Sequence, residues 1–246
     1  MRININIPAK WNELNQKQFE RIALLISTSD ASLIRDIRLL KVLFNFKWYH
    51  FKKSANFYYF LSQVPYSEWK KYIAFILTDN NRTKFEPIIK VGKKLYYGPM
   101  DRIINLTADE FAVADDLHIR FRETKDIEFA QNLFHVLYQE QPQRKLFNKL
   151  DLPGQINKAV SNETLLATEI AYFGCKNHIA NKFKKAFPKS KAGASSKNRT
   201  GFGKIIQQMA KGDLSKTPII KQTNIYEFLF QFQDDIETMQ KAKSKK

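Results

Sequence analysis

Two matching stretches, each marking the start of a helix, constrain the fold of this chain most strongly. They are Leu14-Asn15-Gln16-Lys17-Gln18-Phe19 and Leu106-Thr107-Ala108-Asp109-Glu110-Phe111. Each has the pattern of a capping box, in which the N-cap side chain and the side chain three residues later accept hydrogen bonds from each other's backbone amides. The flanking leucine and phenylalanine are placed to form a hydrophobic staple. The sequence therefore predicts two helices whose starting points and entry angles are fixed locally.

The composition favours helices over a sandwich of many strands. Of 246 residues, 43% are hydrophobic and 20 are Phe, whereas Gly and Pro are limited to 8 each. Few helix breakers and many bulky apolar residues are typical of long packed helices. We therefore expect a mainly α protein, a multi-helix domain with a small β-hairpin or sheet and a C-terminal helix after a flexible basic linker.

One stretch has the texture of strands. Residues 85–99 contain two short apolar runs around Gly92, which indicates a β-hairpin near residues 86–98. The Ile residues of segment 2–7 alternate with polar residues at the period of a strand, which could pair with this hairpin. Apolar residues at helical spacing predict helices in the ranges 15–26, 33–44, 47–60, 67–77, 107–121, 126–137, 162–187, 202–209 and 224–239.

A basic segment rich in small residues divides the chain. Residues 188–201 combine Lys with Ser, Ala and Gly, the composition of a mobile linker. We expect a helical domain over residues 1–187 and a C-terminal helical module with a basic tail over residues 202–246. In that module a short helix ends at Gly212, and the last helix follows a cap formed by Asn224 with Glu227.

The formal net charge of +17 draws the chain toward polyanions or acidic proteins, although an ordinary solvated basic surface accounts for it equally well. Residues 182–204 are rich in lysine and contain no Asp or Glu. This segment is therefore a candidate for neutralising nucleic-acid phosphates without recognising a base sequence. A solvated linker is the other interpretation. The candidate nucleic-acid-binding residues are Lys182, Lys184, Lys185, Lys189, Lys191, Lys197, Arg199 and Lys204.

Two aromatic stretches have both a structural and a functional interpretation. Residues 47–60 interleave Lys with Trp, Tyr and Phe, which would suit a stacking platform for single-stranded nucleic acid; core packing of a helix is the stronger interpretation. The last helix could dock on a partner or back onto its own domain. Its candidate partner-binding residues are Ile225, Phe228, Leu229, Phe232 and Ile236.

Candidate chemical sites are weak. Cys175 is the single cysteine, so no intrachain disulfide forms, and with His178 it supplies only two ligands of a zinc site. Asp115, Asp116 and His118 lie close in sequence, but adjacent helix residues point in different directions, so we interpret them as a solvated helix face. We therefore expect no catalytic residue, no metal and no cofactor, and a protein that is not an enzyme.

The sequence shows neither a signal peptide nor a membrane-spanning segment. Residues 1–7 lack the apolar core of a signal peptide, and no apolar run approaches the roughly 18 residues that span a bilayer. These features predict a soluble protein of a reducing cytoplasm, without membrane association.

The order of five segments carries a family resemblance. The segments are Trp11-Asn12-Glu13-Leu14-Asn15-x-x-Gln18-Phe19, Leu106 to Asp115, Tyr172-Phe173-Gly174-Cys175, Phe202-Gly203-Lys204-Ile205-Ile206-x-x-Met209-Ala210 and Asn224-Ile225-Tyr226-Glu227-Phe228-Leu229. This order resembles that of tailed-bacteriophage and prophage proteins encoded among tail and virion-assembly genes. The final module is similar to the end of tail assembly chaperone-like proteins.

The resemblance implies a non-enzymatic protein of the host cytoplasm, or of the virion, that acts in tail or virion assembly through protein contacts. Its partners would be phage tail or virion proteins, and an oligomer is compatible with this role. The basic linker carries more charge than a chaperone of an apolar tape-measure segment requires. A basic protein of the virion or DNA-packaging machinery, in contact with DNA or an acidic protein surface, is therefore the alternative.

Overall fold

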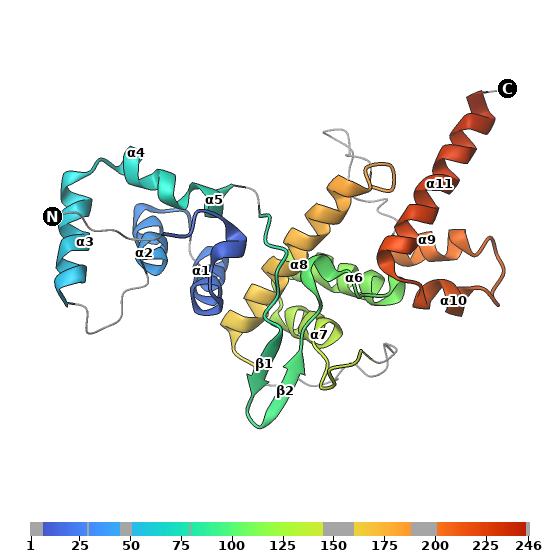
Figure 1. Ribbon diagram of the computed structural model, residues 1–246, viewed down its shortest axis with the longest axis horizontal. Coiled ribbons are helices and arrows are strands. Elements are labelled where there is room, and N and C mark those ends of the chain that lie inside the picture. Colours follow the sequence, from blue (N-terminus) through green and yellow to red (C-terminus); the bar gives the residue numbers. More distant parts are fainter. Residues whose placement is uncertain are drawn as a thin grey trace.

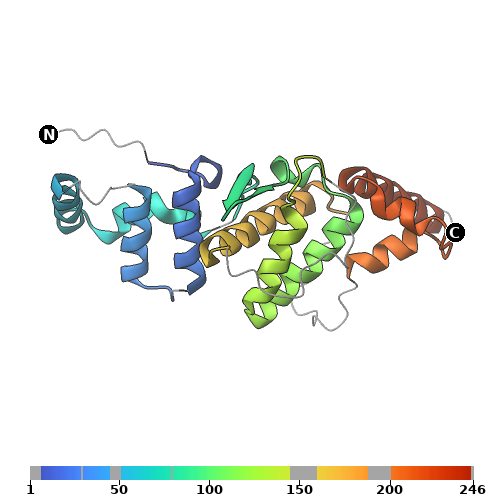
Figure 2. The same ribbon diagram turned by 90° about the horizontal axis from the view of Figure 1, so that it is seen from below.

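The computed structural model describes residues 7–28, 30–44, 51–78, 80–144, 160–187 and 201–244. Within these ranges the chain is mainly helical and contains one two-stranded antiparallel sheet, as the composition predicts. The molecule is elongated, with the first helices at one end, three long helices and the hairpin in the middle, and the last helices at the other end (Figures 1 and 2). Residues 2–6 of the strand expected over 2–7, and residues 188–200 of the linker expected over 188–201, lie outside the described residues.

The N-terminal group of helices begins at the first capping box. The amide of Gln18 donates to Asn15 Oδ1 at 3.0 Å, and the amide of Asn15 donates to Gln18 Oε1 at 3.2 Å, so this box is confirmed. The buried Gln18 side chain also donates to the carbonyls of Val42 and Leu43, which joins the start of one helix to the end of the next. The elements are η1 (Trp11–Glu13), α1 (Gln16–Thr28), α2 (Leu33–Leu43), α3 (Phe51–Gln63), α4 (Tyr66–Trp69), η2 (Lys70–Ile73) and α5 (Ala74–Leu77).

The helix expected over residues 67–77 is divided into three pieces. A 3-10 turn, η2, separates α4 from α5. Trp69, Ile73 and Ile76, one from each piece, are buried.

The middle of the molecule holds the hairpin and three long helices. Strands β1 (Ile88–Val91) and β2 (Lys94–Tyr97) pair with Ile88 opposite Tyr97, and Gly92 adopts a φ of +60° in the turn between them, so the predicted hairpin is confirmed. A short 3-10 turn, η3 (Asp101–Ile103), leads into the helices. These are α6 (Ala108–Thr124), α7 (Ile127–Leu137) and α8 (Asn162–Lys182), whose N-caps are Thr107, as predicted, Asp126 and Ser161.

Helix α8 is the element against which the rest is assembled. It packs on α1 along one side and on α7 along another. The segment before the hairpin crosses it at Gly174, where an added Cβ would overlap the carbonyl group of Arg82. The Cys175 thiol donates to the carbonyl of Thr83 at 3.3 Å, and the Asn80 side chain donates to the carbonyl of Ile170 at 2.6 Å. A glycine is therefore required at position 174, where the backbone of Arg82 lies against α8.

Arg82 joins this crossing segment to the N-terminal group. Its guanidinium is buried, donates to the carbonyls of Trp11 and Leu14, and lies 4.3 Å from the centre of the Phe19 ring. Burial lowers the pKa of Arg82. Carbonyl oxygens and an aromatic face thus hold a buried cation in place.

The C-terminal helices pack on α6. They are α9 (Phe202–Met209), α10 (Thr217–Gln222) and α11 (Ile225–Ser244). The amide of Ala108 donates to the carbonyl of Thr223, and the amide of Ile225 donates to that of Leu106, so the starts of α6 and α11 share backbone hydrogen bonds. We did not expect α10, whose second residue, Pro218, is placed where a helix needs no amide donor.

The cap of α11 differs in detail from the expected one. Asn224 Oδ1 accepts from the amide of Tyr226 at 2.9 Å. The expected donor was the amide of Glu227, one residue later. The Asn224 side chain also donates to the carbonyl of Ile104 at 2.6 Å, which ties the cap to the segment that precedes α6.

The close approach at Gly174 predicts an unusually costly alanine substitution. Gly174→Ala forces the Arg82 backbone away from α8, so we expect a loss of several kcal/mol in the free energy of unfolding, about the size of a severe overpacking defect or more. Urea unfolding followed by circular dichroism measures it. The matched control is Gly203→Ala in α9, where an added Cβ meets nothing within 4 Å and where we expect a gain of about 0.5–1 kcal/mol. Equal effects of the two substitutions would contradict this packing.

Candidate functional site

A cluster of ionisable side chains lies between α6 and α8, with His118 and Glu169 buried and Arg122 at its more exposed edge. His118 Nδ1 lies 2.9 Å from Glu169 Oε1, and Arg122 Nε lies 2.7 Å from the same oxygen. The side chains of His118 and Glu169 are only 5% and 2% exposed. One carboxylate oxygen therefore faces both an imidazole and a guanidinium.

Neighbouring residues close this cluster. Asp115 forms an ion pair with Lys176, and the Phe173 ring stacks on His118 with the guanidinium of Arg122 over its face. The Tyr172 hydroxyl is fully buried, and its pKa is raised first by burial and then by the nearby Asp115. Aromatic rings and paired charges therefore fill the space around Glu169.

This arrangement corrects the interpretation of Asp115 and His118 as a solvated helix face. Both are buried, whereas Asp116 is exposed. Their partners Lys176 and Glu169 come from α8, which lies across this side of α6. No local pattern signals partners about fifty residues away along the chain.

The cysteine and the nearby histidine do not form a reactive pair. Burial raises the pKa of the Cys175 thiol, so it stays protonated and donates to a carbonyl oxygen in the core. Burial and the charges of Arg102 and Lys182 lower the pKa of His178. Among the described residues, no group of three or more His, Cys, Asp or Glu is placed to hold a metal ion.

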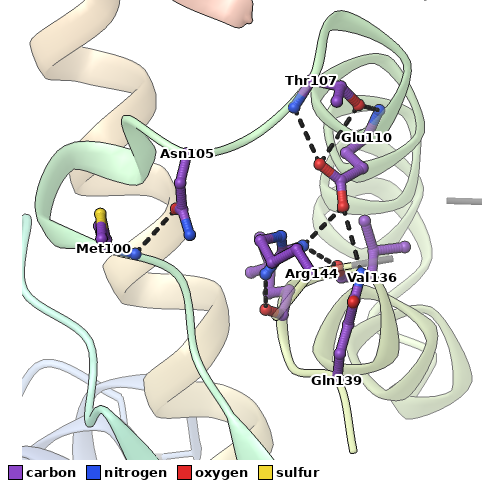
Figure 3. Close-up of polar contacts among 8 residues, drawn as sticks. Met100, Asn105, Thr107, Glu110, Val136, Gln139 and Arg144 are labelled. Carbon is purple, nitrogen blue, oxygen red and sulfur yellow. Dashed lines mark hydrogen bonds and ion pairs between the residues drawn. The ribbon is translucent and has the colours of Figure 1, made fainter. Parts of the chain in front are cut away.

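A second buried carboxylate, Glu110, organises the middle of the molecule (Figure 3). Its Oε2 accepts hydrogen bonds from the amide of Thr107 at 2.8 Å and from the Thr107 hydroxyl, and the amide of Glu110 donates back to that hydroxyl. Its Oε1 accepts from Arg144 at 2.7 Å and from the Gln139 side chain at 3.3 Å. The predicted capping box is confirmed, and it carries an ion pair that the sequence did not reveal.

Arg144 connects this carboxylate to the end of α7. It donates to the carbonyls of Val136 and Leu137 at 2.9 and 2.8 Å. These carbonyls belong to the last turn of a helix, where the dipole favours a cation. The Glu110 carboxylate thus accepts a hydrogen bond from a free backbone amide at the start of α6, and the Arg144 guanidinium donates to carbonyls at the end of α7, while the two groups pair with each other.

The structure separates the candidate nucleic-acid-binding lysines. Lys182 places its ammonium over the rings of Phe183, Tyr226 and Phe230, at 5.5, 5.0 and 5.2 Å from the ring centres. Lys185 forms an ion pair with Glu237 at 2.6 Å. Lys184 and Lys204 are exposed, while Lys189, Lys191, Lys197 and Arg199 lie outside the described residues.

The candidate partner-binding residues of α11 divide into two groups. Ile225, Phe228 and Leu229 are 0–2% exposed and pack into the core, so the first half of the helix docks on the chain's own domain. These three side chains are not available to a partner, because that domain already buries them. Phe232 and Ile236 are only partly buried, and Met239 is 59% exposed. The second half of α11 extends away from the body (Figure 1).

The aromatic stretch near α3 is likewise divided. Phe57 is buried and lies 5.3 Å from the centre of the Phe44 ring, as the core interpretation predicts. Tyr58 and Tyr59 are 54% and 68% exposed. Residues 45–50, including Trp48, lie outside the described part, so base stacking at this surface stays a hypothesis.

Comparison of the chain with protein-family models, curated proteins and solved structures gave no match. Among the described helices, none is long and apolar enough to cross a membrane.

The Glu110–Arg144 pair predicts a large difference between two neighbouring acids. Glu110→Gln leaves Arg144 without its carboxylate and weakens the cap, so we expect a loss of about 3 kcal/mol in the free energy of unfolding. Asp109→Asn removes only a partly exposed pair with Lys221, for which we expect about 0.5 kcal/mol. Thr107→Ala, which removes the cap alone, should cost about 1 kcal/mol.

Chemical denaturation of the three variants under identical conditions measures these values. A loss for Glu110→Gln no larger than that for Asp109→Asn would show that the buried pair does not hold the two helix ends together.

Proposed function

We propose that this chain is a non-enzymatic phage protein that acts in tail or virion assembly through protein contacts, as an assembly chaperone or a structural connector. The resemblance of its ordered segments to virion-assembly proteins supports this role. Its partners are then tail or virion proteins, met in the host cytoplasm. The observation that carries the proposal is the divided surface of α11.

Helix α11 combines a docked half with a free apolar half. Phe228 is anchored by the Phe202 ring at 5.3 Å, and Phe232 stacks on Phe228 at 6.3 Å. Beyond this anchor, the stripe continues through the partly buried Ile236 to Met239, which is 59% exposed. An amphipathic helix with anchors at this spacing suits insertion into a hydrophobic groove of another protein.

The buried clusters fit a structural role. The Glu169 and Glu110 carboxylates each meet cations supplied by other parts of the chain, and aromatic rings fill the surrounding space. Paired and enclosed charges of this kind contribute to a unique packing, and they are strongly destabilising only when one partner is removed. The proposal accordingly assigns no bond-making step to them.

The proposal predicts that the free half of α11 holds a partner. Met239→Glu places a charge in the contact, and we expect about a tenfold loss of copurified partner or more, since burying a methionine contributes about 1.5–3 kcal/mol. Quantitative mass spectrometry after affinity purification from induced cells measures the loss. The control Gln240→Glu adds the same side chain at the neighbouring exposed position. Equal recovery with both variants would contradict a contact through this stripe.

The same purification separates the two versions of the role. A chaperone is absent from purified particles, whereas a connector is present in them at fixed stoichiometry. Mass spectrometry of purified virions distinguishes these outcomes.

A second candidate function, binding of single-stranded nucleic acid, is favoured by one observation. The ammonium of Lys182 lies over the ring of Phe230, a residue that is 52% exposed, and Lys184, two positions along the chain from Lys182, is also exposed. A cation adjacent to an open aromatic face is the combination that contacts phosphates and stacks bases. The basic segment that follows α8 would extend this surface.

Neutralising the basic segment tests this second candidate. Changing Lys184, Lys189, Lys191, Lys197 and Arg199 to Gln should abolish retention of a labelled single-stranded oligothymidylate in low salt. The unmodified protein should bind with a slope of log affinity against log salt of about −3.5 if all five residues contact phosphates. Filter binding over a salt series measures both.

A charge-matched control distinguishes a local contact from general attraction. It changes five exposed cations elsewhere on the chain to Gln: Lys10, Lys17, Arg21, Lys90 and Lys93. If the control loses as much binding as the test variant, the segment has no special role and only the net charge matters.

A further inference from the structure

A groove opens at the N-terminal end of the molecule, between the start of α2 and the helices α4 and α5. Its volume is about 670 Å³, and its lining includes Ile26 from the end of α1, Leu33 from α2, Tyr66 from α4 and Leu77 from α5. Helices and the short connection between α1 and α2 line it. None of the residues that we selected from the sequence as site residues belongs to it.

Apolar stripes from the core run out into this groove. On α2, Leu40 is fully buried, whereas Leu33, seven residues earlier and on the same face, is 54% exposed. On α1, Ile22 is fully buried, whereas Ile26, one turn later, is only partly buried. The core thus ends at the groove with its apolar side chains uncovered.

The polar lining leaves the groove with positive charge. Asp36 is 3% exposed and uses both carboxylate oxygens within the chain, accepting from the Tyr66 hydroxyl at 2.6 Å and from Arg35 Nη2 at 3.3 Å. Lys70 lies over the Tyr66 ring at 5.1 Å, and no carboxylate of the described residues pairs with it. The neighbouring Lys71 pairs with Glu68 at 2.8 Å and does not line the groove.

We propose that this groove binds an acidic amphipathic helix of a partner protein. Apolar side chains at positions i, i+3 or i+4, and i+7 of that helix would cover Ile26 and Leu33, and a flanking carboxylate would pair with Lys70. An added strand is disfavoured, because the lining offers helix faces and no sheet edge. A nucleic acid is disfavoured because its phosphates would leave the apolar floor uncovered.

This inference rests on the proposed function, and it specifies the chemistry of one partner contact. It also places that contact at the end of the molecule opposite α11. The two surfaces use different helices and are tested independently.

A pair of designed peptides tests the groove on the full-length chain. Both are fluorescently labelled amphipathic helices with leucine at positions i, i+3, i+4 and i+7, one flanked by glutamates and the other by lysines. Fluorescence anisotropy should show binding of the glutamate peptide and little binding of the lysine peptide. The affinity for the glutamate peptide should fall as salt is raised, because its carboxylates pair with an exposed cation.

Two substitutions locate the binding. Lys70→Glu replaces attraction by repulsion, and Leu33→Asp charges the uncovered floor; each should weaken the glutamate peptide about tenfold. Lys71→Glu makes the same charge change one residue away and should leave the affinity unchanged. Circular dichroism confirms that all three variants keep the fold, which is expected because the replaced side chains are exposed.

Several outcomes would overturn the proposal. Equal binding of both peptides, or an unchanged affinity in Lys70→Glu and Leu33→Asp, removes the groove as an acidic-helix site. Self-association of the full chain that Leu33→Asp abolishes, measured by light scattering, identifies a second copy as the occupant instead. Binding of an oligothymidylate that Lys70→Glu alone abolishes identifies a nucleic acid.

Copurification from induced cells separates this failure from failure of the proposed function. If the unmodified protein retains a partner that Lys70→Glu retains equally, the groove inference fails and the assembly role stands. If the unmodified protein recovers no tail or virion protein, the assembly role fails, and with it the reason to expect a protein occupant.

Discussion

The buried carboxylate of Glu110 is the interaction on which the middle of the molecule depends. It holds the first turn of α6 through Thr107, and through Arg144 it holds the last turn of α7. It also orients Gln139, whose backbone pairs with Tyr97 of the hairpin. Since the start of α6 in turn shares backbone hydrogen bonds with the start of α11, four elements meet within a few residues of one acid. The cap of α6 is therefore also the point at which α6, α7, α11 and the hairpin are joined.

The elements that could be predicted are those with local causes. Both capping boxes, the Gly92 turn and the short helix α9 depend on residues only a few positions apart. The partners of the buried charges could not be predicted in this way, because Glu169 meets His118 only when α8 lies across α6. For the same reason the sequence alone favours a solvated face for Asp115. It does not predict helix α10 either, because the contacts of α10 with α6 and α9 are tertiary.

For the candidate partner surfaces, too, the sequence shows what is local and not what depends on tertiary contacts. An apolar stripe at helical spacing shows that a helix has a face, and it does not show what covers that face. On α11 the chain's own domain buries Phe228, whereas Met239, on the same stripe, is 59% exposed. The groove at Leu33 gave no sequence signal, because its walls come from segments that are each amphipathic in an ordinary way. Its positive charge comes from Lys70, because the Asp36 carboxylate is paired with Arg35 and accepts a hydrogen bond from Tyr66.

Helix α8 runs through the middle of the molecule. Thr164, near its beginning, bonds to Glu20 of α1, and Phe183, directly after its end, packs on Tyr226 of α11. These two contacts therefore lie near opposite ends of a 21-residue helix that is about 31 Å long. A ligand that engaged both ends of the molecule would gain from avidity only if its own binding elements were as far apart as the two surfaces that it contacts. Shorter ligands would occupy the ends one at a time, and the molecule would then bridge two separate bodies at a fixed gap.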